Sequence, residues 1–531
     1  MWNTSLIHLM QQEDEEKQIT SNNSNKESSV EECSSNSVSH HGPTLSRFSK
    51  SITRINPLEV DTHGSNGDYD TKITVDDDVE EKNVEELLFN PEAWLPITES
   101  RNGNLYYCIF HLISSGIGIQ SLALPFAFVS LGWIWGTMWL SIAFIWQLYT
   151  IWLLVRLHES NSGYRYSRYI QLAMSAFGPK LGKMLALFPV MYLSGGSCVM
   201  LLITGGTTMQ KLHQILYENG LIAHTGSLTT VEWYLVFICL AIAIAQLPNL
   251  NSVAWVSLIS AITALVYCSL IWVLFVTEGG RPSSTEFRPV FKGPETELSR
   301  VMTVISAVGV ISFSFRGHNL VLEIQGTLPT SPKDPTHRRM WKGVLVSYAM
   351  IALCLFPVAI GGFWAYGTLM PKAGLLNAYG KFHGNHGSKL SMAVIYFFLI
   401  INSLCSFQIY AMPVFDNFEL RVVSIRKKPC TGWMRTGLRI LFGGLAFLIS
   451  VAFPFLPLLS QLIGGIALPV TFAYPCFMWI SIKKPDPYGS MWWVNLVLGC
   501  LGILLSVVLV IAAIYNIATE GIPVHFFHPK P

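Results

Sequence analysis

Charged side chains are scarce in this chain. Asp, Glu, Lys and Arg make up 13% of its 531 residues, whereas hydrophobic residues make up 51%. A soluble globular protein carries about 25% charged residues, so the composition argues against one. The 16 Trp, 19 Tyr and 30 Phe suit aromatic belts at two water interfaces. We therefore expect a protein embedded in a lipid bilayer, with no nucleic-acid partner.

The chain also lacks the residue spacings of a metal site. No CxxC pair and no Cys/His cluster with metal-ligand spacing occurs. Thiols in apolar runs usually behave as small hydrophobic side chains. We predict no metal and no cofactor. Eight of the ten Cys lie in such runs, at Cys108, Cys198, Cys239, Cys268, Cys354, Cys405, Cys476 and Cys500.

Residues 1–100 differ in charge from the rest. They hold 20 acidic and 7 basic residues, a net charge of −13, whereas the remainder holds 13 acidic and 28 basic residues, a net charge of +15. This stretch is rich in Ser, Asn, Asp and Glu, and buries too little apolar surface to offset the entropy of ordering. We predict a disordered acidic tail over 1–90 and a membrane domain over 91–531. The start has neither the basic flank nor the apolar core of a signal peptide, so we expect the first span to be its own anchor.

Apolar stretches of membrane-spanning length recur about eleven times. A helix needs about 20 residues to cross the hydrocarbon core. The fourth stretch is the least regular, because it breaks at Pro248. The expected spans are 105–130, 133–155, 184–209, 232–247, 250–276, 301–324, 344–366, 388–414, 436–456, 458–482 and 492–515.

Basic residues in the connections predict the orientation. With the N-terminus in the cytoplasm, the cytoplasmic connections hold 17 Lys and Arg, and the opposite side holds 9. Cytoplasmic loops of membrane proteins carry such an excess. We therefore predict a multi-pass membrane protein with a cytoplasmic N-terminus, and an odd number of spans puts the C-terminus on the other side.

Two spans carry signs of a broken helix. The first contains "HLISSGIGIQSLALP" and the sixth contains "SFRGHNLVLEIQ". Free backbone at membrane depth is tolerated only where protein or a water-filled cavity satisfies it. Breaks at matched positions indicate a midplane site between two inverted repeats, here five spans each with an eleventh outside them. The alternative is that Gly116 and Gly118 only allow close helix packing.

Ionisable residues gather in the sixth span. Arg316, His318 and Glu323 interrupt a run that is otherwise apolar, and such residues inside a membrane usually serve function. We predict that they line a polar cavity. Glu323 is the only acid well inside a predicted span, and because burial would favour its protonated form it is the candidate proton carrier. Asn319 lies four residues earlier, on the same helix face.

Two histidines and two further acids are weaker candidates for a functional role. Histidine titrates near neutral pH, so His318, beside the break, is a second proton-coupling candidate. His111 is more simply read as a hydrogen-bonded packing residue. Asp416 and Glu419 fall at the end of the eighth span near Arg421, where we expect a solvated structural network.

These residues also carry a family likeness. The chain resembles the plant amino acid/auxin permease family, in its lysine/histidine transporter-like branch. The matching stretches cover residues 93–484, nearly all of the membrane domain. They are "AWLPITESRNGNLYYCIFH", "LALPFAFVSLGW", "RYSRYIQLAMSAFGPKLG", "QLPNLNSVAWVSLISA", "GHNLVLEIQGTLP", "GGFWAYG", "SFQIYAMPVFDNFE" and "LPVTFAYPCFMW".

The resemblance implies an all-helical LeuT-type fold with about eleven spans, of which the first and sixth are broken. It implies proton-driven import of amino acids, no enzymatic activity, and the plasma membrane as the family's usual location. Oligomeric state cannot be read from it. The substrate would lie between the two breaks, which comprise Ser115, Gly116, Gly118, Gln120, Arg316, Gly317, His318 and Asn319.

Two positions depart from the family pattern. Gln120 stands where the family has a second Gly, and Arg316 stands where it has a small residue before "GHN". Arg316 adds a fixed positive charge. If it faces the substrate, neutral or acidic amino acids should be favoured over cationic ones. The substrate preference therefore cannot be carried over from the family.

The half-helix after the first break should direct its backbone N–H groups and positive dipole end at a substrate carboxylate. Two other classes of protein are alternatives to a transporter. An intramembrane acyltransferase or protease needs a nucleophile–base pair or facing metal ligands, and the spacing of Ser and His here does not supply them. An amino acid sensor of the same fold, without net transport, stays open, and an uptake assay separates it from a transporter.

Overall fold

The structure is a computed structural model. It describes residues 94–520, except for gaps at 161–162, 222–227, 248–249, 278–281, 283–284, 291–295, 316, 332–333, 373, 384–388 and 454–455. The chain divides into two units, Met1–Asp76 and Asp77–Pro531, and every described residue belongs to the second. The predicted acidic tail, Pro248 and Arg316 lie outside the described residues, so the predictions made for them stay predictions.

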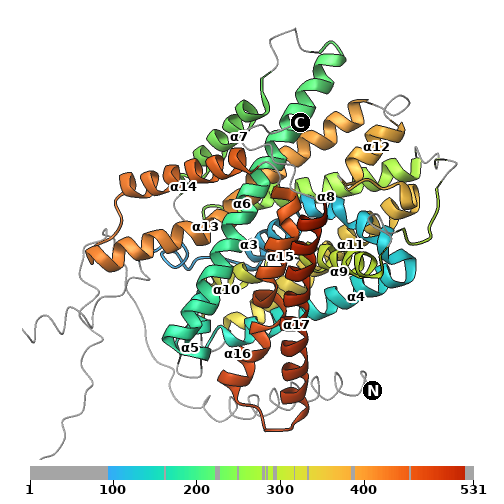
Figure 1. Ribbon diagram of the computed structural model, residues 1–531. Helices are drawn as coiled ribbons and strands as arrows, with labels where there is room; N and C mark the ends of the chain where they lie inside the picture. Colours follow the sequence, from blue (N-terminus) through green and yellow to red (C-terminus); the bar gives the residue numbers. More distant parts are fainter. Residues whose placement is uncertain are drawn as a thin grey trace, which may run out of the picture. The chain divides into compact units, whose positions relative to one another are not determined.

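Helices joined by loops make up the described residues, in which only two isolated β-bridges and no strand occur (Figure 1). The elements in chain order are α3 (Leu105–Gly116), η2 (Ile119–Ala123), α4 (Leu124–Leu157), α5 (Tyr169–Phe177), α6 (Pro179–Glu218), α7 (Thr230–Ile244), α8 (Ala254–Thr277), α9 (Glu297–Ser314), α10 (His318–Gly326), α11 (Thr336–Tyr366), η3 (Gly367–Leu369), α12 (Leu375–His383), α13 (Lys389–Arg426), α14 (Gly432–Ala452), α15 (Leu456–Phe472), α16 (Tyr474–Lys483) and α17 (Ser490–Glu520).

The prediction of an all-helical polytopic membrane protein is confirmed. Nine helical stretches in the described part of the chain are long and apolar enough to cross a membrane. The count of eleven spans, two of them broken, stays a prediction. One reason is that α7, with 15 residues, is short for a span, and another is that α3 has only 12.

Several helices begin where a polar side chain caps them. Asn104 accepts a hydrogen bond from the backbone N–H of Tyr107 and starts α3. Thr229 and Glu232 form a reciprocal capping box at the start of α7. Such caps satisfy N–H groups that have no partner inside the helix.

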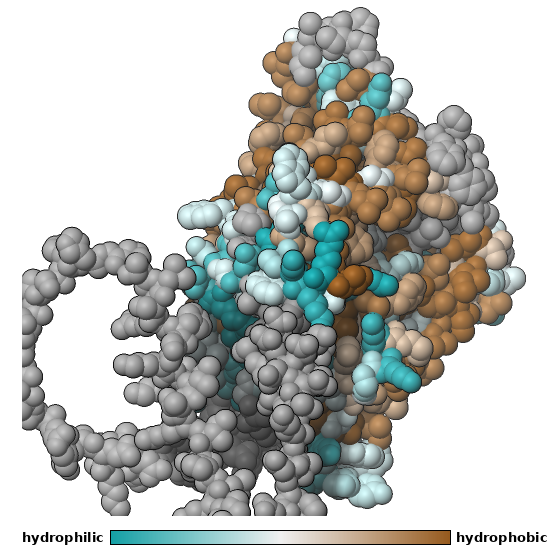
Figure 2. Space-filling model, turned by 90° about the vertical axis from the view of Figure 1, so that its left-hand side faces the viewer, coloured by the Kyte–Doolittle hydropathy of each residue, from teal (hydrophilic) through white to brown (hydrophobic). Residues whose placement is uncertain are grey.

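Apolar side chains cover much of the outer surface. Figure 2 shows hydrophobic residues over wide areas of one face, with hydrophilic residues gathered toward one side. Val497, Leu504 and Ile511 repeat every seven residues on α17, and each is about half exposed. An extended exposed apolar surface of this kind fits contact with lipid.

A backbone kink divides α4 into two helices. Gly132 has φ +69° and ψ −174° inside this 34-residue element. Glycine reaches that region readily, whereas other residues do so only at a steric cost. The kink falls between the predicted first and second spans, 105–130 and 133–155, so the predicted boundary matches a change of backbone direction.

The helices that surround the candidate site come from both halves of the chain. α13 packs against α6, α8 and α3, and α3 in turn packs against α11 and α8. The short α10 contacts α3, α4, α5, α11, α13 and α15. The end of α3 and the start of α10 therefore lie inside the helical bundle.

α13 is longer than predicted. It runs to Arg426, twelve residues beyond the end of the predicted span 388–414.

The segment before α3 is docked on the bundle. Leu95 is fully buried and packs with Val423 of α13 and Cys430. Ile97 is also buried, and Arg435 of α14 donates a hydrogen bond to the carbonyl of Trp94 at 2.9 Å. The ordered membrane domain therefore includes this segment.

Truncations on either side of this segment should differ in effect. Removing residues 1–80 should leave the melting temperature of the detergent-solubilised protein unchanged. Removing residues 1–100 also removes Leu95 and Ile97, whose burial stabilises the fold by about 1.5–3 kcal/mol each, and should lower the melting temperature by roughly 5 °C or more. Thermal unfolding of both truncations tests this. A large decrease in melting temperature when only residues 1–80 are removed would show that the tail itself stabilises the domain.

Candidate functional site

Two helix ends meet inside the bundle. α3 ends at Gly116, and Ile117 and Gly118 have extended backbone. α9 ends at Ser314, and α10 begins after Gly317, whose φ is +114°. A Cβ atom on Gly317 would lie 2.9 Å from the Oγ of Ser115. The end of α3 and the start of α10 are therefore in direct contact.

The glycines at these ends have different structural roles. Gly317 has a backbone conformation that residues with a Cβ atom rarely adopt. Gly118 has φ −132° and ψ 178°, which any residue can adopt. A Cβ atom on Gly116 would collide with the side chain of Ile351 on α11. Gly116 thus allows close helix packing, one of the alternatives left open by the sequence, and a role in substrate binding stays a prediction.

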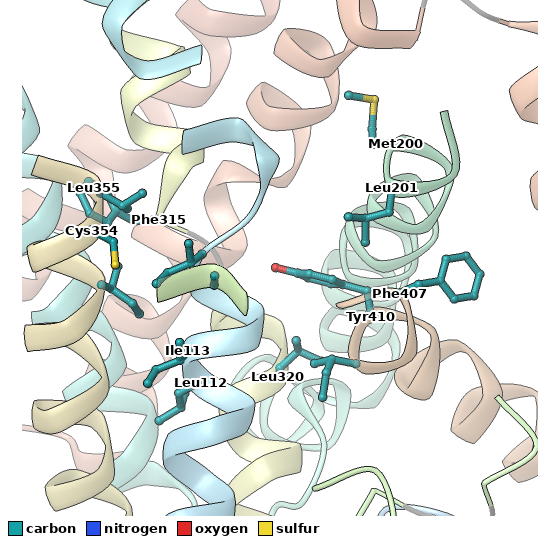
Figure 3. Packing of buried hydrophobic residues seen from close by; sticks show 14 of the residues in the cluster. Leu112, Ile113, Met200, Leu201, Phe315, Leu320, Cys354, Leu355, Phe407 and Tyr410 are labelled. Atoms are coloured by element: carbon teal, nitrogen blue, oxygen red, sulfur yellow. The ribbon is translucent and has the colours of Figure 1, made fainter. Parts of the chain in front are cut away.

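A tyrosine from α13 binds the end of α3. The hydroxyl of Tyr410 donates a hydrogen bond to the carbonyl of Ser115 at 2.6 Å, and both residues are buried. Carbonyls in the last turn of a helix have no partner within the helix, so this bond satisfies one of them. Figure 3 shows the rings of Tyr410 and Phe407 pointing in opposite directions from α13. Tyr410 therefore holds α13 against the end of α3.

Small polar side chains connect α3, α8 and α13 next to this end. Ser114 donates to the hydroxyl of Ser260 at 2.7 Å, and Asn402 donates to the same hydroxyl at 3.1 Å. His111 Nδ1 lies 2.7 Å from the hydroxyl of Ser257. These serines were not singled out from the sequence, although Ser257 and Ser260 share a helix face. His111 is a buried, hydrogen-bonded packing residue, the simpler of the two predicted roles.

His318, the first residue of α10, is fixed by α4. Its Nε2 lies 3.1 Å from the carbonyl oxygen of Gln147 and 3.0 Å from the hydroxyl of Thr150. Since a carbonyl oxygen only accepts, Nε2 carries the hydrogen of the neutral ring. Nδ1 is buried and has no hydrogen-bond partner among the residues described. His318 can therefore accept a hydrogen bond from a bound ligand or a proton.

Asn319 faces α6. Its Nδ2 donates to the hydroxyl of Ser194 at 2.9 Å. The side chain is fully buried, and its Oδ1 has no partner in the described part of the chain. A buried polar atom without a partner is costly, so Oδ1 is a candidate acceptor for a ligand.

Glu323 is buried on α10, one turn beyond Asn319, as the sequence predicts for a shared face. It is 5% exposed, and its Oε2 has no hydrogen-bond partner within the described residues. The charges of Asp416 and Arg168 both act on it. Glu323 is therefore a buried carboxyl group, one oxygen of which has no hydrogen-bond partner among the described residues.

The prediction that Asp416 and Glu419 belong to a solvated network is wrong. Both lie on α13 beyond the predicted span 388–414, and each is 1% exposed. Their partners are not Arg421 but arginines from other elements. Arg168, the N-cap residue of α5, contacts both carboxylate oxygens of Asp416 at 2.5 and 3.2 Å. Arg435 of α14 lies 2.9 Å from Glu419, so the network is buried rather than solvated.

A charged side chain, Arg165, holds the end of α10. Arg165 donates to the carbonyls of Leu328 at 2.8 Å and Gln325 at 3.3 Å.

His158, the C-cap residue of α4, is buried. Burial and the charges of Arg165 and Arg101 lower the pKa of His158 well below its usual value. His158 therefore stays neutral at neutral pH.

The structure brings together most of the predicted substrate residues. Ser115 and Gly116 end α3, and the buried run 317–319 begins α10 beside them. Gln120 lies in η2 and is partly exposed, while the position of Arg316 is not among those described. In the described part of the chain, no group of three or more His, Cys, Asp or Glu side chains could hold a metal ion.

Comparison with known proteins finds several relatives. A family model described as "Transmembrane amino acid transporter protein" matches residues 101–518. Lysine histidine transporter-like 8 of Arabidopsis thaliana is 50% identical over 441 residues, which cover 83% of this chain and 84% of that protein. Lysine histidine transporter-like 7 of the same plant is 47% identical over 439 residues, covering 82% and 90%.

The chain is also similar to a solved structure. It is titled "Substrate-bound outward-open state of a Na+-coupled sialic acid symporter reveals a novel Na+-site". It is 12% identical, has a TM-score of 0.48, and covers 82% of this chain and 95% of that one.

Proposed function

The chain belongs to the transmembrane amino acid transporter family, and we propose that it imports amino acids together with protons across the plasma membrane. The family consists of transporters and not of enzymes. The named relatives are called transporters, which favours transport over a sensor that does not move its ligand. The N-terminus would face the cytoplasm, and the repeats of a LeuT-type fold would rock around the site.

The contact between the end of α3 and the start of α10 is the observation that carries this proposal. The C-terminal end of a helix is partially negative and the N-terminal end partially positive. A zwitterionic amino acid beside this contact would place its ammonium group toward the carbonyls of α3 and Asn319 Oδ1. Its carboxylate would lie toward the N–H groups at the start of α10 and of the half-helix after Gly118. Ser115, Gly116 and Gln120 would complete the site.

Glu323 is the proposed proton carrier. An ionised carboxylate inside a membrane is costly, so a buried Glu323 holds a proton more readily than one that faces water. Glu323 shares a helix face with Asn319, which would link the proton to the substrate. His318 would assist, since its Nδ1 can accept a proton or a hydrogen bond.

The charge of Arg316 bears on the choice of substrate. Placing two like charges about 4 Å apart costs roughly 1–4 kcal/mol, depending on the effective dielectric. If Arg316 faces the site, it would therefore disfavour lysine or arginine as substrates. We propose neutral or acidic amino acids as the preferred class, although relatives are named for lysine and histidine.

Uptake in cells that lack their own amino acid transport tests the function. Labelled amino acid should accumulate when the outside is more acidic than the inside, and a protonophore should abolish the accumulation. Replacing sodium with choline should make no difference. Binding without accumulation would indicate a sensor, and a strict sodium requirement would overturn proton coupling.

A further inference from the structure

We propose that the guanidinium of Arg168 is shared between Asp416 and Glu323, and that its transfer between them couples the proton on Glu323 to the segment before α3. The proposal rests on the proposed function, because it takes Glu323 to be the proton carrier. It assigns Arg168 and Asp416 a positioning role. We call Arg168, Asp416, Ile97 and Thr98 the Arg168 cluster.

The Arg168 cluster joins three parts of the chain. Arg168 precedes α5 and binds Asp416 of α13 through Nε and Nη2, with both side chains almost fully buried. Its Nη2 also donates to the hydroxyl of Thr98 at 3.3 Å. The backbone N–H of Ile97 donates to Asp416 at 3.4 Å. These bonds hold the segment before α3 against α5 and α13.

α10 packs beside this cluster, at the residue that precedes Arg168. A Cβ atom on Gly326 would lie 2.9 Å from the Cβ of Ser167, the residue before Arg168. Glu323 precedes Gly326 by three residues on the same helix and therefore faces the same side. The charges of Arg168 and Asp416 both act on Glu323. We therefore take these two buried carboxylates, Glu323 and Asp416, to compete for one guanidinium.

The proton on Glu323 decides this competition. With Glu323 protonated, Arg168 and Asp416 form a neutral pair, and the bidentate contact in the structure fits that state. With Glu323 ionised, the site holds two negative charges and one positive charge, and burial makes an unpaired carboxylate costly. Arg168 is then drawn toward α10, and its bonds to Asp416 and Thr98 weaken. Loss of the proton therefore loosens the segment that leads into α3.

The other ionisable groups near α10 bind backbone carbonyls, are engaged elsewhere, are phenols, or are exposed. Arg165 donates to the carbonyls of Gln325 and Leu328. His318 contacts Thr150 and Gln147, and His111 contacts Ser257. Glu419 contacts Arg435, Arg339 contacts Asp334, and Arg156 lies over the ring of Trp152. Arg338 and Lys342 of α11 are exposed. The buried phenols on the contacting helices include Tyr169, Tyr348 and Tyr410.

The dependence of uptake on pH tests the sharing. Asp416→Asn leaves Arg168 to Glu323 alone, which favours ionised Glu323, so the midpoint of uptake should move to more acidic pH by about one unit. Arg168→Gln removes the positive charge and should move the midpoint to more alkaline pH. Glu419→Gln is the matched control, because it neutralises another buried, paired carboxylate on α13. Its midpoint should stay at the wild-type value.

A second measurement does not depend on transport. Hydrogen exchange of the Ile97 amide reports the bond to Asp416 directly. Above the uptake midpoint, this amide should exchange faster in wild type than in Glu323→Gln at the same pH, because the amide side chain mimics the protonated carboxyl. Equal exchange in the two proteins would overturn the proposal even if Asp416→Asn fails to fold.

The outcomes separate the two proposals. If Glu323→Gln keeps the wild-type pH dependence, Glu323 does not carry the proton, and the proposed coupling is wrong. If Glu323→Gln removes the pH dependence while Asp416→Asn leaves the midpoint in place, coupling stands and the sharing is wrong. In that case the Arg168–Asp416 pair only stabilises the fold.

Discussion

Replacing Glu323 by Gln should abolish accumulation driven by external acid and leave the exchange of internal for external amino acid intact. Gln has nearly the same shape as the protonated carboxyl but cannot release a proton. The variant can therefore move its loaded site across the membrane without drawing energy from the proton gradient. One transported proton supports at most about tenfold accumulation per pH unit, since one unit corresponds to 1.36 kcal/mol. In the variant this gain should disappear.

The measurement compares net uptake and counterflow per molecule at the cell surface. Glu297→Gln is the control, because Glu297 is the first residue of α9, the helix that precedes α10, but is exposed and pairs with Arg300 at the surface. It should keep the wild-type response to acid. Unchanged acid stimulation in Glu323→Gln would remove Glu323 from the coupling role.

Gly317→Ala should reduce uptake by tenfold or more. Its φ of +114° is unfavourable for alanine, and strained backbone of this kind costs about 1–3 kcal/mol. The added methyl group would also lie 2.9 Å from the hydroxyl oxygen of Ser115. Both effects act where the end of α3 meets the start of α10. The variant should therefore disturb the site even if the rest of the bundle folds normally.

Gly195→Ala provides the comparison for this substitution. Gly195 lies inside α6, and no atom lies within 4 Å of the position its Cβ would take. Alanine is favoured over glycine in a helix, so this variant should transport normally. Uptake and substrate binding should be measured for both variants at equal surface expression. Wild-type activity in Gly317→Ala would mean that the backbone at this helix start adapts without loss.

Hydropathy, together with the Gly, Pro and polar residues that separate apolar stretches, predicts the helices well, because each span must be apolar over its own length. The boundary at Gly132 is local too, since one glycine there turns the backbone. The end of α13 was not predictable in this way. Its last turns are polar in sequence, yet Asp416 and Glu419 are buried there by partners on other elements.

The arginine partners of Asp416 and Glu419 could not be predicted from positions in the sequence. Arg421 follows Asp416 by five residues, which puts it on a different helix face, because only residues three or four apart are neighbours. The true partner, Arg168, is 248 residues away in the chain. The role of a glycine cannot be predicted from the sequence either, because it depends on contacts and backbone angles. Gly116 makes room for Ile351, whereas Gly317 has positive φ, and both demands select the same residue.

The docked segment before α3 gives the chain a point of mechanical input. Ile97 and Thr98 are bonded to Asp416 and Arg168, and the backbone ahead of them continues into the acidic stretch. Tension applied to that stretch, for example by a partner that anchors it, would pass along the covalent chain through the contacts of Trp94 and Leu95 and then into these few bonds. The same bonds lie beside the carboxyl group that we take to carry the proton. Pulling on the N-terminus would therefore do work on the coupling machinery without any ligand entering the site.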